Sequence, residues 1–323
     1  MRVKDQNMKL LIPLQSDRAA APVVFSLAIV LCACAWASAQ TERKIISDDF
    51  TGNRKEVTST NRASTASAAA RARSRRTYRL ATKPIARPRT NPNGDDDAKL
   101  GITIWRLRPV TTGDSGSTAG GNGTRILTRE KGTTTEWVPE RVEADTNFRD
   151  GDRVRLSIES ASNGYLYVVD RELFADGSTG DAMLIYPWAG ADNQVQPGRL
   201  VDIPAQEDDP SFFTARPSSA RQVGEVLTII ITSSRLDLPI SDKPLQLSSS
   251  QVAQWEKTWG GQTERFEMDG GAGQAWTKEE QLASAKRGTR QLTREDPPPQ
   301  TIYRVATTDK KALLVNVRLR YGK

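Results

Sequence analysis

Short apolar segments divided by Gly, Pro and Asp turns fill the chain from Lys99 onward, and this pattern limits the fold more than any other feature. Val154, Leu156 and Ile158 alternate with polar residues, a period of two that is typical of a strand with one solvent-exposed face. The almost unbroken apolar run at 225–232 indicates a central strand buried on both faces. We therefore predict a mainly β fold, a β-sandwich that is immunoglobulin-like in its general architecture.

The β-sandwich is expected to occupy residues 99–240, because strand-like segments and turns alternate throughout this part of the chain. The turn at 162–164 predicts that strands 153–158 and 165–170 form a hairpin. The strands predicted in this domain cover residues 101–107, 125–128, 133–138, 153–158, 165–170, 182–187, 199–203, 212–215 and 225–232.

Helical signals begin after residue 240. Ser248 and Gln251 fit a capping box, which marks the start of a helix. Val252, Trp255 and Trp259 follow at positions i, i+3 and i+7, so they share one face of that helix. We expect this apolar face to pack onto the sandwich.

The rest of the C-terminal extension, which spans 241–323, is predicted to hold a second helix and a pair of strands. The second helix starts at Thr277 and runs to about Ala285. Strands 301–306 and 313–321 follow a Pro-rich stretch and are expected to form a terminal β-hairpin that completes or extends the sheets.

The chain of 323 residues contains no histidine and two cysteines, Cys32 and Cys34. Without histidine, Ser-His-Asp and Cys-His catalysis and HExxH metal sites are excluded. Both cysteines lie in an apolar N-terminal run, so processing of that run would also remove thiolate chemistry and zinc clusters. We therefore expect no cofactor and no metal, and a protein that is not an enzyme.

The N-terminal segment 1–39 has the pattern of an export signal. A basic stretch precedes an uncharged run that ends in Ala37-Ser38-Ala39, and this predicts cleavage between Ala39 and Gln40. Two alternatives stay open: lipidation at Cys34, and retention of the uncleaved segment as a membrane anchor. All three predict an exported protein that is periplasmic, secreted or membrane-anchored.

Residues 40–98 are predicted to form a disordered basic stem, because they are rich in Ser, Thr, Ala and Arg and poor in apolar residues. Nine basic residues and no acidic residue lie between Arg62 and Arg89, whereas the part from 99 to 323 is close to neutral. After an export signal, such a stem would meet anionic polymers of the cell envelope and not nucleic acid. The interpretation that we favour is a solvated linker without a specific partner, because charge runs are commonly solvated tails.

Five segments follow one another in the predicted sandwich: FRDGDRVRLSIES (148–160), NGYLYVVD (163–170), LIYP (184–187), 193–204 and GEVLTIII (224–231). In this order they resemble the bacterial domain of unknown function DUF4384, over about residues 140–235. The resemblance implies a small β-rich module, found alone in exported proteins or joined to other domains. It implies no agreed activity and no established catalytic residue.

Four acidic residues, Asp170, Glu172, Asp176 and Asp181, cluster around one predicted turn. Paired carboxylates could hydrolyse glycosides without histidine or cysteine. Asp176, Ser178 and Asp181 also offer oxygen ligands to calcium, although the full pattern of a calcium loop is missing. The interpretation that we favour is turn chemistry, in which these side chains bond to the backbone of a hairpin.

Four aromatic residues, Tyr165, Tyr167, Tyr186 and Trp188, are the candidates for ligand contact, because flat rings can bind a sugar or a peptide. Packing in the core is the interpretation that we favour for them. Taken together, the sequence predicts an exported, non-catalytic module that serves in binding or assembly at the envelope, with an envelope protein or an anionic envelope polymer as partner. The alternatives are a carboxylate-dependent glycan hydrolase and anionic-polymer binding through the stem.

Overall fold

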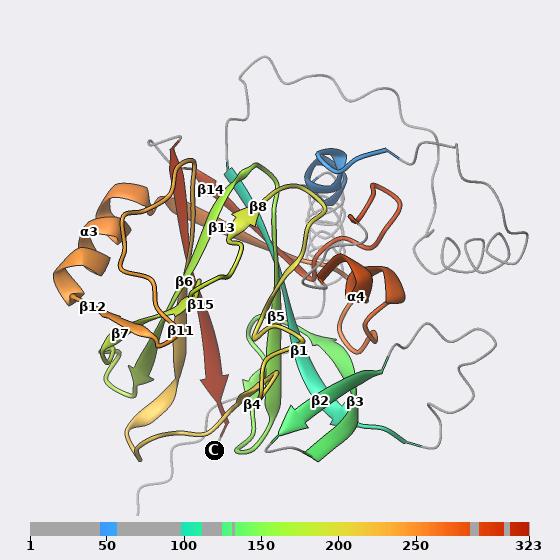
Figure 1. The fold of residues 1–323 in the computed structure, drawn as a ribbon, viewed down its shortest axis with the longest axis horizontal. Coiled ribbons are helices and arrows are strands. Elements are labelled where there is room, and N and C mark those ends of the chain that lie inside the picture. Colours follow the sequence, from blue (N-terminus) through green and yellow to red (C-terminus); the bar gives the residue numbers. More distant parts are fainter. Residues whose placement is uncertain are drawn as a thin grey trace, which may run out of the picture. The chain divides into compact units, whose positions relative to one another are not determined.

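A computed structural model of the protein describes residues 46–56, 98–111, 125–130, 133–284, 291–306 and 311–322. All of them belong to one compact unit, Arg43–Lys323. The predicted export signal at 1–39 and most of the predicted stem lie outside the described residues. The protein is mainly β, with two multi-stranded sheets that do not close into a barrel (Figure 1). None of the helices in the described part of the chain is long and apolar enough to cross a membrane.

The first sheet, named here the β1 sheet, has eight strands. Strand β1 pairs antiparallel with three neighbours, β5, β14 and β3, and the short strands β9 and β10 pair with β5. Its strands are β1 (Ala98–Pro109), β2 (Ile126–Glu130), β3 (Thr133–Val142), β5 (Arg153–Ser160), β9 (Val201–Ile203), β10 (Phe213–Thr214), β13 (Gln262–Glu267) and β14 (Thr301–Ala306).

The second sheet, named the β11 sheet, has seven strands. Strand β11 lies between β6 and β15 and pairs with both in antiparallel register. The pairing of β15 with β4 is parallel. Its strands are β4 (Asn147–Phe148), β6 (Gly164–Phe174), β7 (Ala182–Tyr186), β8 (Gln194–Val195), β11 (Gln222–Thr232), β12 (Leu245–Leu247) and β15 (Ala312–Tyr321).

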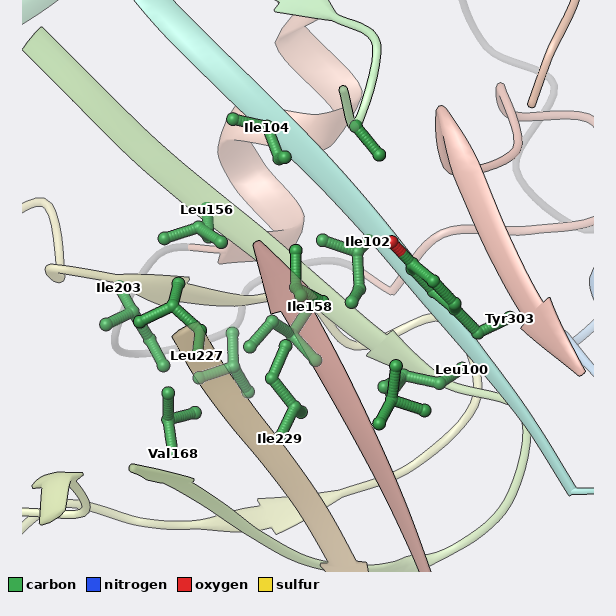
Figure 2. Packing of buried hydrophobic residues seen from close by; sticks show 14 of the residues in the cluster. Leu100, Ile102, Ile104, Leu156, Ile158, Val168, Ile203, Leu227, Ile229 and Tyr303 are labelled. Atoms are coloured by element: carbon green, nitrogen blue, oxygen red, sulfur yellow. The ribbon is translucent and has the colours of Figure 1, made fainter. Parts of the chain in front are cut away.

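The two sheets pack face to face around one hydrophobic core. Figure 2 shows Leu100, Ile102 and Ile158 of the β1 sheet opposite Val168 and Ile229 of the β11 sheet. Each of these side chains is at most 1% exposed. This packing confirms the predicted strands and their alternation, and the arrangement is sandwich-like.

Strand β11 is buried on both faces, as its apolar run predicts. Leu227, Ile229 and Ile231 point into the shared core, whereas Ile230 belongs to a second apolar cluster on the outer face of the sheet. The prediction of a solvent-exposed face on β5 is wrong, because every residue from Val154 to Ser160 is buried. A cover of other segments lies over the outer face of the β1 sheet and removes it from solvent.

Neither predicted hairpin forms. Strand β5 belongs to the β1 sheet and β6 to the β11 sheet, so the turn between them carries the chain across the core. Likewise, β14 pairs with β1 and β13, whereas β15 pairs with β11 and β4. Each of these strands places one apolar face in the shared core, so consecutive strands face each other across it instead of pairing.

Both predicted helices are present. Helix α3 (Ser249–Trp259) begins after Ser248, whose hydroxyl accepts a hydrogen bond from the Gln251 backbone N–H. It lies beside the β11 sheet (Figure 1), and its Val252 and Trp255 pack onto the outer face of that sheet. Helix α4 (Lys278–Ser284) begins with a reciprocal capping box between Thr277 and Glu280.

Residues 46–56 correct the prediction of a disordered stem over their length. They form a helix at 46–52 and a turn, and Phe50 is 1% exposed. Phe50 packs over Gly101 of β1, where a Cβ atom would lie 2.8 Å from its ring. The apolar contacts of Ile46 and Phe50 and the buried ion pair of Arg54 with Glu159 together hold the segment on the β1 sheet. Residues 57–97, on which the prediction of anionic-polymer binding rests, lie outside the described residues.

Candidate functional site

One of the four candidate carboxylates serves a turn. Asp176 accepts hydrogen bonds from the backbone N–H and the hydroxyl of Ser178, at 2.9 and 2.6 Å, and these bonds lower the pKa of its carboxyl group. Asp181 is exposed and accepts a bond from the side chain of Gln246. The turn interpretation therefore fits Asp176, whereas the bond of Asp181 joins it to the side chain of a residue on another strand. In the part of the chain that the structure describes, no group of three or more acidic, His or Cys side chains could hold a metal ion.

Asp170 and Glu172 lie elsewhere, on the core-facing side of β6. They continue the alternation of Leu166 and Val168 toward the end of the strand. Glu172 accepts a hydrogen bond from the Ser218 hydroxyl and stands opposite Glu225 of β11 in the strand register. The inner face of the β11 sheet therefore changes from apolar to acidic near one end of the sandwich.

A pocket of about 110 Å³ lies between the sheets at this end. Asp170, Glu225 and Tyr321 are its polar side chains from the β11 sheet, and they come from β6, β11 and β15 respectively. The β1 sheet supplies Val154 and Phe213 to the opposite wall. We call this feature the acidic pocket.

Each carboxylate of the acidic pocket keeps one oxygen without a hydrogen-bond partner among the described residues. Oε1 of Glu225 accepts bonds from the Tyr321 hydroxyl at 2.9 Å and from the side-chain amide of Gln222 at 2.7 Å. Oε2 of Glu225 and Oδ1 of Asp170 are buried and have no such partner. Most buried polar groups in proteins are satisfied, so two orphaned oxygens in one pocket mark it as unusual.

The pocket raises the pKa of both carboxyl groups. Burial raises the pKa of Asp170 to about 6, and the like charge of Glu172 acts in the same direction. Burial and the neighbouring Asp170 raise the pKa of Glu225 to about 7. The Tyr321 hydroxyl has a raised pKa because of its burial and the adjacent Glu225, so it stays a hydrogen-bond donor at neutral pH.

The size of the acidic pocket limits what it can hold. A cavity of about 150 Å³ accommodates a benzene ring. A pocket of about 110 Å³ has room for a slim alkyl or ammonium group and not for a sugar ring. Its chemistry therefore suits a small cationic group whose donors reach the two orphaned oxygens.

Glu225 was not among the candidates from the sequence. Its position in the alternation of β11 indicates its role. Glu225 points to the same side of the strand as Leu227, Ile229 and Ile231, which is the core-facing side. An acid in register with buried aliphatic residues at a strand end predicts a carboxylate between the sheets. That inference needs the strand partners, because only the pairing of β11 with β6 and β15 brings Asp170 and Tyr321 beside it.

The four candidate aromatic residues do not form one platform. Tyr167 is 2% exposed and lies on the outer face of the β11 sheet, where its hydroxyl accepts a hydrogen bond from the Leu236 N–H at 2.8 Å. Tyr186 belongs to the inner core and stacks edge to face with Trp188 at 5.2 Å between ring centroids. Tyr165 is half-buried at the beginning of β6. Core packing thus describes Tyr167 and Tyr186.

No family model matches this chain, and no match is found among curated proteins or solved structures. The resemblance to DUF4384 therefore stays a prediction from the sequence. The geometry of the acidic pocket and the sequence patterns of the N-terminal segment are the observations that bear on function.

Proposed function

We propose that this chain is an exported, non-catalytic β-rich module that binds a partner at the bacterial cell envelope, and that the acidic pocket receives a cationic group of that partner. One observation carries the proposal: Oδ1 of Asp170 and Oε2 of Glu225 are buried in the same pocket without a partner among the described residues. A buried carboxylate is costly unless a donor or a cation pairs with it. A cationic ligand would supply both the hydrogen-bond donor and the positive charge.

The walls of the pocket favour an ammonium group at the end of an alkyl chain. Val154, Phe213 and Leu319 give it apolar sides, which suit methylene groups. An ammonium group carries three donors, enough for both orphaned oxygens. A lysine-like side chain or an amine-bearing envelope component has this combination of an apolar stem and a charged end.

The location at the envelope rests on the N-terminal segment. Its uncharged run before Ala39 and Gln40 supports export to the periplasm or the medium, and lipidation at Cys34 or an uncleaved segment would keep the protein at a membrane. The resemblance to DUF4384 supports the same class of exported module. We also propose an immunoglobulin-like general architecture, which the two face-to-face, mostly antiparallel sheets support.

A second candidate is a carboxylate-dependent glycan hydrolase that uses Asp170 and Glu225. The raised pKa values of both groups favour it, since such an enzyme keeps one carboxyl protonated as the acid. The small volume of the pocket counts against it. Release of reducing ends from purified envelope glycans, lost in E225Q, would establish this candidate in place of the binding module.

Calorimetric titration with n-butylammonium and with n-butanol tests the proposed pocket. The two probes have similar shapes, and only the first carries a charge. Saturable binding of n-butylammonium is expected for the unmodified chain and for the control E264Q, because Glu264 is an exposed residue of β13 far along the other sheet from the pocket residues. Binding is expected to disappear in E225Q and in D170N.

Two results would overturn the pocket assignment. Equal binding of n-butanol would show that charge is not recognised. Full retention of n-butylammonium binding in E225Q and D170N would place the ligand elsewhere.

A further inference from the structure

A second recess, of about 400 Å³, lies where β6 begins, and we call it the polar hollow. Tyr165 at this place and Asp170 of the acidic pocket are five residues apart on β6, about 16 Å along the strand. Tyr165 contacts the outer apolar cluster, whereas Asp170 points between the sheets. The side chains that line the hollow include Asn163, Tyr165, Gln194, Gln196, Arg199 and Ser233. It is thus separate from the acidic pocket and has a different chemistry.

Arg199 is held in a fixed position at this hollow. Its Nη1 donates to Oδ2 of Asp192 at 2.9 Å and to the backbone carbonyl of Gln194 at 2.8 Å, and Nη2 reaches the Asp192 carbonyl at 3.4 Å. No acceptor among the described residues is recorded for its Nε. A guanidinium group that is already ordered loses little entropy when it pairs with a planar anion.

The remaining polar groups are exposed amides and hydroxyls. Gln194 donates to the Tyr165 hydroxyl at 3.4 Å, which orients both groups at the hollow. Arg235 lies over the Tyr165 ring at 5.3 Å from its centroid, so that ring face is covered and a second guanidinium stands nearby. Arg199 and Arg235 thus place two positive charges near the carboxylate of Asp192.

We propose that the polar hollow is a binding site for a carboxylated saccharide unit. The volume lies in the range of ordinary ligand sites, which starts at about 300 Å³. Amides and hydroxyls suit the hydroxyl groups of a sugar, and Arg199 suits a carboxylate. Stacking on the Tyr165 ring is not part of the site, because Arg235 occupies its face.

Titration of the ¹⁵N-labelled protein with tri-galacturonate, and with a neutral galactose trimer as comparison, tests this site by NMR. Amide shifts are expected at residues 163–165, 194–199 and 233 with the acidic trimer. R199Q is expected to weaken binding at least tenfold, as loss of a hydrogen bond to a charged group does. The matched control is R216Q, since Arg216 forms an exposed ion pair with Asp150.

Q194A provides a second variant at an exposed position, in case R199Q disturbs the loop through Asp192. It is expected to weaken the acidic trimer severalfold with an unchanged spectrum elsewhere. The proposal is overturned if the neutral trimer binds as tightly, if the shifts fall outside these residues, or if both variants bind like the unmodified chain. None of these outcomes depends on the acidic pocket, so the two sites can fail separately.

Discussion

The outer faces of the two sheets are both covered, but the cover of the β11 sheet is mainly apolar, whereas the cover of the β1 sheet combines apolar clusters with buried ion pairs. On the β11 sheet, α3 lays Val252 and Trp255 over Tyr167, Ile230 and Leu314. This cover is held by apolar contact, and its free energy scales with the area removed from water. A more exposed ion pair, Arg171–Glu256, also joins β6 to the helix.

On the β1 sheet, buried ion pairs add to the apolar contacts of the cover. Arg54, from the N-terminal segment, donates to both oxygens of Glu159 at 2.7 Å and also reaches the carbonyl oxygens of Thr293, Asp296 and Pro297. Two other ion pairs are similarly buried: one joins β3 to α4, and the other joins β5 to β9 within the sheet. At most 4% of any side chain in the three pairs is exposed. The pairs are Arg54–Glu159, Arg141–Glu280 and Arg155–Asp202.

The comparison of the two covers indicates where open binding sites lie in this molecule. A buried ion pair fixes one register of its partners, because removal of either charge leaves the other without compensation. An apolar cover is less specific and adapts to changes of shape. Since both outer faces are occupied, the recessed sites lie at strand ends: the acidic pocket and the polar hollow.

The largest loss of stability is expected from a change to the ion pairs on the outer face of the β1 sheet. Glu159→Ala leaves Arg54 buried without its partner and removes the acceptor of the Gly198 N–H, so the free energy of unfolding should fall by about 3–5 kcal/mol. Urea unfolding measures it. The double variant R54M/E159M should recover part of this loss, because no buried charge is then left unpaired, whereas the bonds to the Gly198 N–H and to the three carbonyl oxygens stay broken. A loss below about 1 kcal/mol in Glu159→Ala would contradict a contribution of the buried ion pairs to this cover.

A smaller loss is expected on the apolar side. Trp255→Ala removes a side chain that is 9% exposed and lies between α3 and the β11 sheet, so stability should fall by about 3 kcal/mol. Trp259 is half-buried and stacks on Trp255, so Trp259→Ala serves as the comparison with a lower cost. Equal losses in both variants would show that burial does not determine the strength of this cover.

The acidic pocket should make stability depend on pH. The pKa values of Asp170 and Glu225 are raised in the folded protein to about 6 and about 7, so the folded state binds more protons than the unfolded state below neutrality. Stability should therefore fall as the pH rises from about 4 to 7, by about 2 kcal/mol from Asp170. The variant D170N/E225Q should flatten this slope in thermal unfolding at several pH values. An unchanged slope would show that neither carboxyl is perturbed.

The smallest loss of stability is expected from a change to the N-terminal cap of α3. Ser248→Ala removes the acceptor for the Gln251 N–H and should cost about 1 kcal/mol. Ser249→Ala is the control, because Ser249 is an exposed first residue of the helix. If the two variants unfold at the same urea concentration, the cap does not stabilise the helix.

The apolar side of the molecule could be predicted from the sequence to a large extent. The capping residue Ser248 and the spacing of Val252, Trp255 and Trp259 placed α3 correctly, because periodicity reports which face is apolar. The same holds for the inner faces of most strands. Strand β13 could not be found in this way, since its residues are mostly polar and exposed and it is defined by its pairing with β14.

The charged side could not be predicted. Arg54 and Glu159 are indistinguishable in sequence from solvated residues, since burial of a charge depends on a partner 105 residues away. The two expected hairpins failed for a related reason: a turn shows that the chain reverses and leaves open which sheet it enters. For the candidate site, Asp170 was named from the sequence, whereas Glu225 and Tyr321 needed the pairing of β11 with its neighbours.

The central claim is that one oxygen of each carboxyl group in the acidic pocket, Oδ1 of Asp170 and Oε2 of Glu225, has no partner among the described residues and receives a cation. Carboxyl-resolved ¹³C NMR titration of Asp170 and Glu225, with and without n-butylammonium, tests it most directly. The account predicts pKa values of about 6 and about 7 in the ligand-free protein, and lower values for both when the cation is bound. Values near 4 in the ligand-free protein, or values that do not move with n-butylammonium, would contradict it.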